Sequence, residues 1–146
     1  MNVNPILGTK YWIGVASRDH VIKGVQGGFA QLCHGKKTSL NKMSTGDWLI
    51  YYSSKSSLKV NTPYQKFTAI GRVVDSNIYL VKINDDFMPY RRNVDFIRCK
   101  EVSIHPLIPN LSFIKNKRYW GYPFRFSHLE ICAEDFELIS SQMKVT

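Results

Sequence analysis

The sequence predicts a single α+β domain, spanning residues 1–146, in which β-strands dominate and the helices are short. A chain of 146 residues suits one compact domain, and its hydrophobic fraction of 44% and charged fraction of 21% are those of a globular protein. Aromatic residues make up 13% of the chain and favour strands. Strand-like alternation recurs along the sequence, whereas helical spacing is confined to short stretches.

The first elements are predicted from alternation and turn signals. Residues 10–17 alternate between two faces, one of which carries small residues, and this pattern indicates a strand. We expect Asp19 to cap a helical turn that runs to Val25 and ends at a glycine-rich segment. Residues 40–43 predict a further turn, and residues 48–53 predict a second strand after a Gly-Asp turn signal.

The middle of the chain predicts three more strands. Residues 54–64 are rich in serine and lysine and predict an exposed loop. Residues 67–74 form the third predicted strand, whose inner glycine indicates a bend or a close approach. Residues 78–83 and 90–99 predict the fourth and fifth strands, and an Asn-Asp-Asp break separates them.

The C-terminal part predicts helical segments. Residues 106–114 predict a short helix with a kink at Pro109. Ser127 and Glu130 have the spacing of a capping box, which predicts the start of a helix. Residues 134–143 carry apolar side chains at helical spacing and predict an amphipathic helix.

The basic composition favours an anionic partner. The chain has 20 Lys and Arg against 11 Asp and Glu, a net charge of +9. Such an excess attracts polyanions, of which nucleic acid is the commonest, although a basic surface also serves solubility alone. We therefore expect RNA or DNA as the partner.

The cysteine pattern argues against a zinc ribbon. Cys33, Cys99 and Cys132 are odd in number and widely spaced, and no CxxC pair is present to build a zinc ribbon. We expect reduced thiols, no metal, no cofactor and a cytoplasmic location. The N-terminus lacks an apolar signal core, and no run reaches transmembrane length, so we expect no membrane association.

The segment 27–53 concentrates groups that suit a flat, hydrogen-bonding ligand such as a nucleobase. A glycine pair next to Phe29 allows backbone amides to approach a ligand closely. Amide, imidazole and hydroxyl groups follow, and the segment closes on a strand that ends in aromatic residues and a serine. The candidates in this segment are Phe29, Gln31, His34, Tyr52 and Ser53.

Further candidates lie outside or beside that segment. Ser17 and His20 follow the first predicted strand and can hydrogen-bond the edge of a base, although His20 also fits a surface position. Lys36, next to a glycine, places a cation and a backbone donor where a phosphate can bind. Residues 115–120, KNKRYW, interleave cations with aromatics, a pattern that suits nucleic acid but is also common in solvated loops.

A catalytic site is not expected. Cys33 and His34 are adjacent, and neighbouring residues of a strand point to opposite faces, so we do not expect a thiolate–imidazole pair. The chain contains no GxSxG, Walker, HExxH or dinucleotide-binding motif. Asp85 and Asp86 fall in a predicted turn, where simple solvation explains them.

Blocks along nearly the whole chain resemble the EVE-domain family, in its stand-alone bacterial and archaeal form. The blocks are KYWIGVASRDHV, GGFAQLCHGKKTSLNKMSTGDWLIYYS, FTAIGRVV, PYRRNVDF, HPLIPNLSFI, YWGYPFR and EDFELI, in this order. This resemblance implies a PUA-like fold, related to the YTH readers of methylated adenine: a small, mostly antiparallel β-barrel flanked by short helices.

The resemblance also implies a pocket that accepts a modified base flipped from its strand. It assigns Ser17 as the strand-end serine and Phe29 as an aromatic wall, at a position where many relatives have tryptophan. Trp120 and Arg125 lie in a motif typical of the stand-alone members. With the residue-based candidates, the expected pocket comprises Ser17, His20, Phe29, Gln31, His34, Tyr52, Ser53 and Trp120. The expected phosphate-binding residues are Lys36, Arg91, Arg92, Lys117, Arg118 and Arg125.

The function expected from these residues is non-catalytic nucleic-acid binding with recognition of a modified, for example methylated, base. Two alternatives stay open: an enzyme that acts on a modified nucleotide or base through His34 or Cys33, and a small-molecule sensor.

Overall fold

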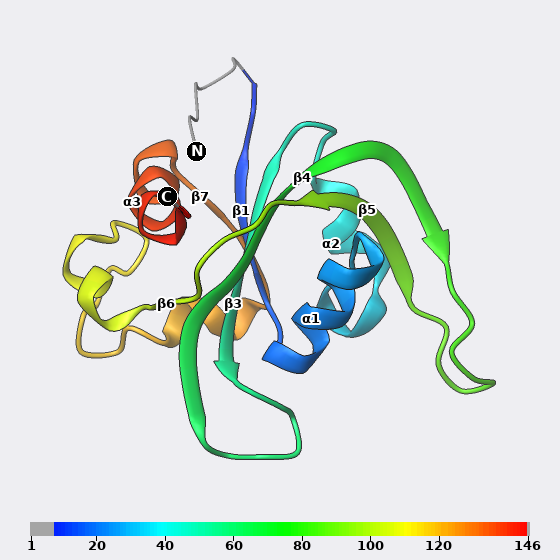
Figure 1. The fold of residues 1–146 in the computed structure, drawn as a ribbon, viewed down its shortest axis with the longest axis horizontal. Helices are drawn as coiled ribbons and strands as arrows, with labels where there is room; N and C mark the ends of the chain where they lie inside the picture. Colours follow the sequence, from blue (N-terminus) through cyan, green and yellow to red (C-terminus); the bar gives the residue numbers. More distant parts are fainter. Residues whose placement is uncertain (1–7, 146) are drawn as a thin grey trace.

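One seven-stranded sheet organises the fold in the computed structural model, which describes residues 8–145 (Figure 1). Its strands are β1 (Tyr11–Val15), β2 (Phe29–Ala30), β3 (Trp48–Lys55), β4 (Pro63–Leu80), β5 (Tyr90–Phe96), β6 (Val102–Ser103) and β7 (His128–Ile131). They run in the order β2–β5–β4–β3–β1–β7, and β6 pairs with β4 off this path. All pairings are antiparallel except β1 with β3. Residues 1–7, where we expect no signal segment, lie outside the described part.

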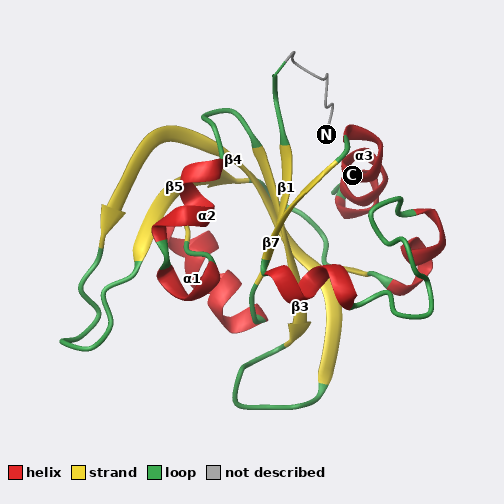
Figure 2. Ribbon diagram, turned by 180° about the vertical axis from the view of Figure 1, so that it is seen from behind, coloured by secondary structure: helices red, strands yellow, loops and turns green. Residues whose placement is uncertain are grey.

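Short helices lie on both sides of the strands. They are α1 (Arg18–Gly27), α2 (Lys37–Lys42), α3 (Ala133–Met143) and the 3₁₀ segments η1 (Cys33–Gly35), η2 (His105–Asn110) and η3 (Tyr122–Phe126). Figures 1 and 2 show α1 and α2 together on one side of the central strands and α3 on the other. This arrangement confirms the predicted α+β class, with a mostly antiparallel sheet whose end strands are β2 and β7.

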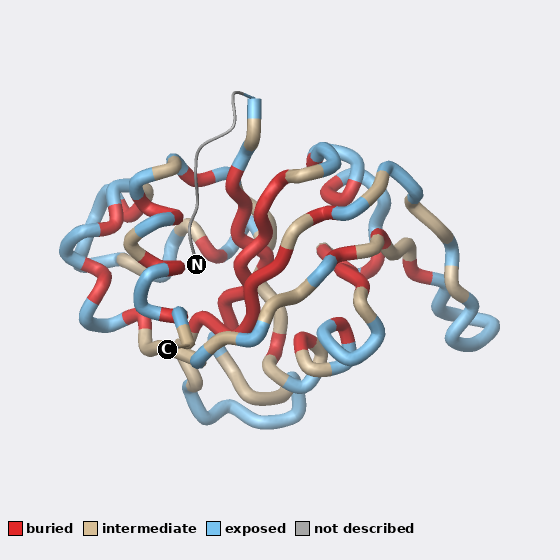
Figure 3. Tube along the Cα trace, turned by 45° about the horizontal axis from the view of Figure 1, so that its top comes forward, coloured by how far each residue is buried: buried red, intermediate tan, exposed pale blue. Residues whose placement is uncertain are grey.

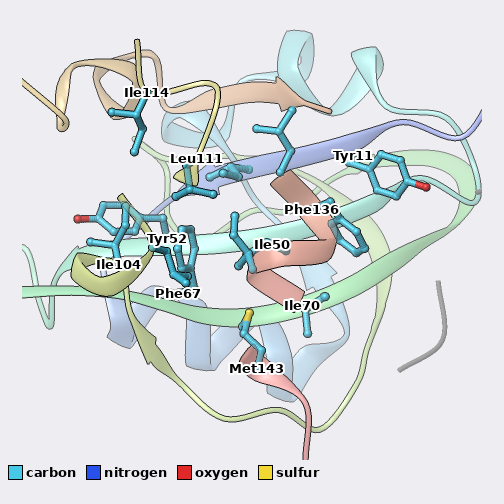
Figure 4. Close-up of a cluster of buried hydrophobic side chains, with 14 of the residues drawn as sticks. Tyr11, Ile50, Tyr52, Phe67, Ile70, Ile104, Leu111, Ile114, Phe136 and Met143 are labelled. Carbon is cyan, nitrogen blue, oxygen red and sulfur yellow. The ribbon is translucent and has the colours of Figure 1, made fainter. Parts of the chain in front are cut away.

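Strand alternation divides the interior into two apolar clusters. In β1, Ile13 joins the cluster under α3, whereas its neighbour Trp12 joins the cluster under α1 and α2. In β3, Ile50 and Leu49 divide in the same way. Figure 4 shows the cluster under α3, where Phe136 of that helix packs among strand side chains. Both faces of the central strands are therefore buried, as the buried segments in Figure 3 show.

A buried carboxylate fixes the turn that precedes β3. Asp47 is 1% exposed and accepts hydrogen bonds from the Lys10 amide at 3.0 Å, the Trp12 indole at 2.9 Å and the Ser44 amide at 2.8 Å. These bonds join the turn to the start of β1. The predicted Gly-Asp turn therefore also sets the parallel pairing of β1 with β3.

Two predicted strands are in fact one. Residues 67–74 and 78–83 were expected to be separate, but β4 runs continuously from Pro63 to Leu80. Its pairing with β5 shifts between Val73 and Ile78, and this irregularity bends the strand without ending it. In Figure 1 the resulting β4–β5 hairpin reaches away from the rest of the sheet.

The predicted capping box is wrong. Ser127 has a left-handed backbone with φ of 63°, and Glu130 lies in β7, which pairs with β1. The four residues of β7 are too few for a clear alternation, so local spacing misled the prediction. The helix begins only at Ala133, close to the predicted residue 134.

The other helical predictions hold with shifted bounds. The N-terminal helix begins at Arg18, so Asp19 lies in its first turn and not at the cap. Gly28, with φ of 72°, ends this helix as the glycine-rich segment predicted. The segment around Pro109 forms the 3₁₀ turns of η2. None of the helices within residues 8–145 has the length and apolar character needed to span a membrane.

Candidate functional site

Phe29, Gln31 and Arg91 come together where β2 meets β5. Phe29 pairs with Asn93 and Ala30 with Arg92, which sets Gln31 opposite Arg91. Because side chains alternate along a strand, the first group shares one face and Ala30 joins the interior cluster under α1 and α2. We call Phe29, Gln31, Arg91 and the adjoining His20 the Phe29 face.

The side chains of the Phe29 face are linked to one another. The Arg91 guanidinium lies 3.9 Å from the centroid of the Phe29 ring, and its Nε donates to Gln31 Oε1 at 3.0 Å. His20 Nε2 lies 3.1 Å from the Gln31 carbonyl oxygen and donates to it, since a carbonyl only accepts. An aromatic ring, a cation, an amide and an imidazole thus converge within a small area.

Two glycines allow the close packing at the borders of this face. A Cβ at Gly27, the last residue of α1, would lie 2.5 Å from Cε2 of Phe29. Gly35 has φ of 82°, and a Cβ there would lie 2.4 Å from Cβ of Pro89 near the tip of the β4–β5 hairpin. The end of α1 therefore packs directly against the Phe29 ring, and the β4–β5 hairpin packs directly against the η1 turn.

The β3 candidates do not line the Phe29 face. Tyr52 is 1% exposed and stacks on Phe124 in the cluster under α3, with 4.1 Å between ring centroids. Ser53 is fully buried and hydrogen-bonds Thr68. It is Tyr51 that points toward Gln31, with its hydroxyl 3.5 Å from the Gln31 carbonyl, and burial raises the pKa of this phenol.

The remaining candidates of the N-terminal half precede His20 or follow Gln31 along the chain. Ser17 is buried and its hydroxyl donates to the Asp19 carboxylate, while His34 and Lys36 are exposed on the η1 turn. Cys33 and His34 both have positive φ in that turn, so the strand geometry assumed for them is wrong. The Cys33 thiol instead lies 2.9 Å from the Ser39 hydroxyl.

Arg92 does not present its charge to a ligand. It is 3% exposed, and its guanidinium donates to the carbonyls of Leu40, Met43 and Asp75. Arg92 thereby ties α2 to the β4–β5 hairpin, a structural position that its neighbour Arg91, on the opposite face, does not share.

The C-terminal candidates lie in a second region. Trp120 packs against the cluster under α3, with its ring 5.3 Å from that of His105, and Lys117, Arg118 and Arg125 are exposed. These residues belong to the segment that joins η2 to β7. Because β2 and β7 are at opposite ends of the strand order, the structure divides the expected site in two.

That second region borders a groove of about 770 Å³, which we call the η3 groove. It is lined by Lys42, Phe113, Lys115, Asn116, Tyr119, Tyr122, Pro123, Phe126, His128 and Leu129. Sequence reasoning missed most of these residues, apart from the signal of the KNKRYW segment. It also missed Tyr79, whose hydroxyl donates to Asn93 at 3.0 Å beside Arg91.

No cluster of three or more His, Cys, Asp or Glu side chains suited to a metal ion occurs within residues 8–145. The side chains of the Phe29 face supply stacking, hydrogen bonding and charge.

Comparisons with known sequences identify the family of the chain. Residues 10–142 match the EVE domain. The chain is 61% identical to the "UPF0310 protein in gntR 5'region" of Bacillus licheniformis, over 87% of this chain and 86% of that one. It is 50% identical to a UPF0310 protein of Mycolicibacterium vanbaalenii, over 90% and 91% of the two chains.

The fold is also similar to solved structures of low sequence identity. The crystal structure of the Pho92 YTH domain in complex with m6A superposes with a TM-score of 0.60 at 16% identity, covering all of this chain and 88% of that one. At this identity the similarity concerns the fold alone.

Proposed function

Because this chain belongs to the EVE-domain family and has its PUA-like α+β fold, we propose that it binds nucleic acid and holds a modified nucleobase flipped from its strand. The base would sit on the Phe29 face, among Phe29, Gln31, His20 and Arg91. The Arg91 guanidinium over the Phe29 ring is the observation that carries this proposal, because this planar cation covers a ring that is only 9% exposed, and a flat base could take its place.

The groups around the ring have the chemistry that a base needs. A base that replaces or adjoins the Arg91 guanidinium gains a stacking partner, and stacking on an aromatic side chain contributes about 1–3 kcal/mol per base. The Gln31 side chain and the His20 ring supply hydrogen bonds to its edge. Together these offset the few kcal/mol that unstacking costs.

Cations near this face would hold the strand. Arg91 is half-buried and Lys36 is exposed on the η1 turn, so both can reach a phosphate. Such contacts add affinity that is independent of sequence and weakens with salt. A methyl group in an apolar niche adds only about 1–2 kcal/mol, so we expect modest discrimination between modified and unmodified strands.

We also propose that this binding is not catalytic. The Cys33 thiol pairs with the Ser39 hydroxyl and not with an imidazole, so a thiolate nucleophile has no base beside it. The Pho92 YTH domain, which has a similar fold, was solved in complex with m6A, and this supports the proposal that the fold of this chain can hold a modified base.

The test is binding of short oligonucleotides, RNA and DNA, with and without methylated adenine, methylated cytosine or hydroxymethylated cytosine. We expect at least one modified strand to bind more tightly than its unmodified match at physiological salt. Equal affinities across every pair would refute recognition of a modified base while leaving nucleic-acid binding intact.

A pair of matched substitutions places the effect on the Phe29 face. Phe29→Leu keeps apolar bulk but removes the stacking surface, so we expect the preference for the modified strand to disappear. Phe96→Leu makes the same change on β5, but the Phe96 ring packs on Tyr51 in the cluster under α1 and α2 and does not belong to the Phe29 face. This variant should therefore keep the preference for the modified strand.

A further inference from the structure

The η3 groove has exposed aromatic walls. Tyr119, Tyr122 and Phe126 are 61%, 57% and 61% exposed, although rings of this size are usually half-buried or more. The rings of Tyr122 and Phe126 meet edge to face with 5.6 Å between centroids. At about 770 Å³ the groove falls within the range of about 300–1,000 Å³ typical of ligand sites.

A buried imidazole lies at the base of this groove. Both ring nitrogens of His128 are buried, and neither has a hydrogen-bond partner among residues 8–145. The ring is fixed by stacking on Trp12, with centroids 4.6 Å apart and planes 12° from parallel. Burial, with a smaller effect of the Lys42 charge, lowers the pKa of His128 to about 4. At neutral pH the ring is therefore uncharged, and it forms part of the apolar wall of the groove.

The rim of the groove is positively charged. Lys42 at the end of α2 and Lys115 are exposed and line it, and no Asp or Glu belongs to its lining. The guanidinium of Arg118 lies 5.6 Å from the centroid of Tyr119, and that of Arg125 lies 5.8 Å from that of Tyr122. Cations interleaved with exposed rings suit a polyanion that carries flat groups.

We infer that the η3 groove is a second binding site, which takes an unpaired, unmodified base of a single-stranded nucleic acid. The base stacks on Tyr122 or Phe126, over the buried ring of His128, and the adjoining phosphates meet Lys42 and Lys115. The groove shares no residue with the Phe29 face, so the two sites hold different nucleotides. This inference rests on the nucleic-acid part of the proposed function and is independent of base modification.

Paired substitutions at the same positions test stacking. The probe is a short, fluorescein-labelled, unmodified oligothymidylate, followed by anisotropy at physiological salt. The double variant Tyr122→Leu/Phe126→Leu keeps apolar side chains but loses both rings, and its affinity should fall at least about fivefold. The double variant Tyr122→Phe/Phe126→Tyr keeps both rings and should restore binding. A groove for an apolar peptide would accept leucine, so this pair separates the two kinds of occupant.

Photocrosslinking locates the strand. An oligonucleotide that carries 5-bromouracil is irradiated on the wild-type protein, and peptides are analysed by mass spectrometry. We expect adducts on the segment 119–128, and competition by unlabelled oligothymidylate should remove them. Thermal melting of each variant confirms that the fold is intact, which substitutions of exposed rings should preserve.

The outcomes separate this inference from the proposed function. Unchanged oligothymidylate affinity in the leucine double variant, or adducts confined to other segments, would overturn the second site and leave the Phe29 face unaffected. A wild-type protein that binds neither modified nor unmodified strands would overturn both. Loss of binding in the leucine variant with restoration in the aromatic variant supports the second site, whatever the modified-base panel shows.

Discussion

The guanidinium of Arg91 covers the ring of Phe29 at 3.9 Å from its centroid. A base that stacks on this ring must displace or adjoin the guanidinium, which is then free to contact the neighbouring phosphate. Arg91→Gln should therefore remove one phosphate contact from the complex. We expect the slope of log affinity against log salt concentration to become shallower by about 1, measured by titration of a modified oligonucleotide.

The matched control for this change is Arg98→Gln. Arg98 carries the same charge and is exposed to solvent, but it follows β5 and is not part of the Phe29 face. Its replacement should change the slope much less. Equal slopes for the two variants would mean that Arg91 contributes only general charge.

Gly27 controls the position of the Phe29 ring. A Cβ at this residue would lie 2.5 Å from Cε2 and 2.7 Å from Cδ2 of Phe29, so Gly27→Ala forces the ring to move. Because the ring is held between the end of α1 and Arg91, we expect a loss of about 1–3 kcal/mol in the free energy of unfolding. Urea unfolding measures the loss, and the oligonucleotide panel should show a weaker preference for the modified strand.

Gly121→Ala is the comparison for that variant. A Cβ at Gly121 has no atom within 4 Å, and its backbone needs no positive φ. Its stability should stay within about 0.5 kcal/mol of the wild type. A Gly27→Ala protein with wild-type stability and binding would show that the ring has room to move freely.

Alternation in the sequence was enough to predict most of the strands. Residues 10–17 become β1, as their alternation predicted, and residues 48–53 become β3, an apolar run that follows a turn signal and is buried on both faces. The same signal divided β4 in two, because a shift of register within a long strand resembles a strand end. The short strands β2 and β7 have too few residues for any period and exist only through their partners.

Part of the Phe29 face could be predicted because three of its residues are close together in the sequence. Phe29, Gln31 and His20 are close in sequence, so local reasoning placed them together. The choice of Tyr52 over Tyr51 required knowledge of which face of β3 meets α1, and that depends on long-range packing. His128 gave no signal, since only the pairing of β7 with β1 brings it onto Trp12.

Asp47 makes a separate prediction about stability. Its buried carboxylate accepts three hydrogen bonds, and Asp47→Asn replaces one acceptor by an NH₂ group that faces donors. We expect the free energy of unfolding to fall by about 2–3 kcal/mol, since at least one buried donor loses its partner. The same substitution at Asp85, which is exposed on the hairpin, should have almost no effect. Urea unfolding of the two variants measures the difference, and similar values would contradict the structural position of Asp47.

His128 predicts how stability depends on pH. The pKa of His128 in the folded protein, about 4, lies below the ordinary value of 6.5. Between these pH values the unfolded chain therefore binds a proton at His128 that the folded protein does not bind. The resulting stabilisation is complete above pH 6.5 and is lost as the pH falls toward 4, by up to about 3 kcal/mol. His128→Phe keeps a ring on Trp12 but does not titrate, while carboxylates and the nearby Lys42 and Lys115 are common to both proteins. Urea unfolding at pH 7 and pH 4 should therefore show a larger loss for the wild type than for the variant. Parallel losses would mean that water reaches the imidazole and that the base of the η3 groove is open.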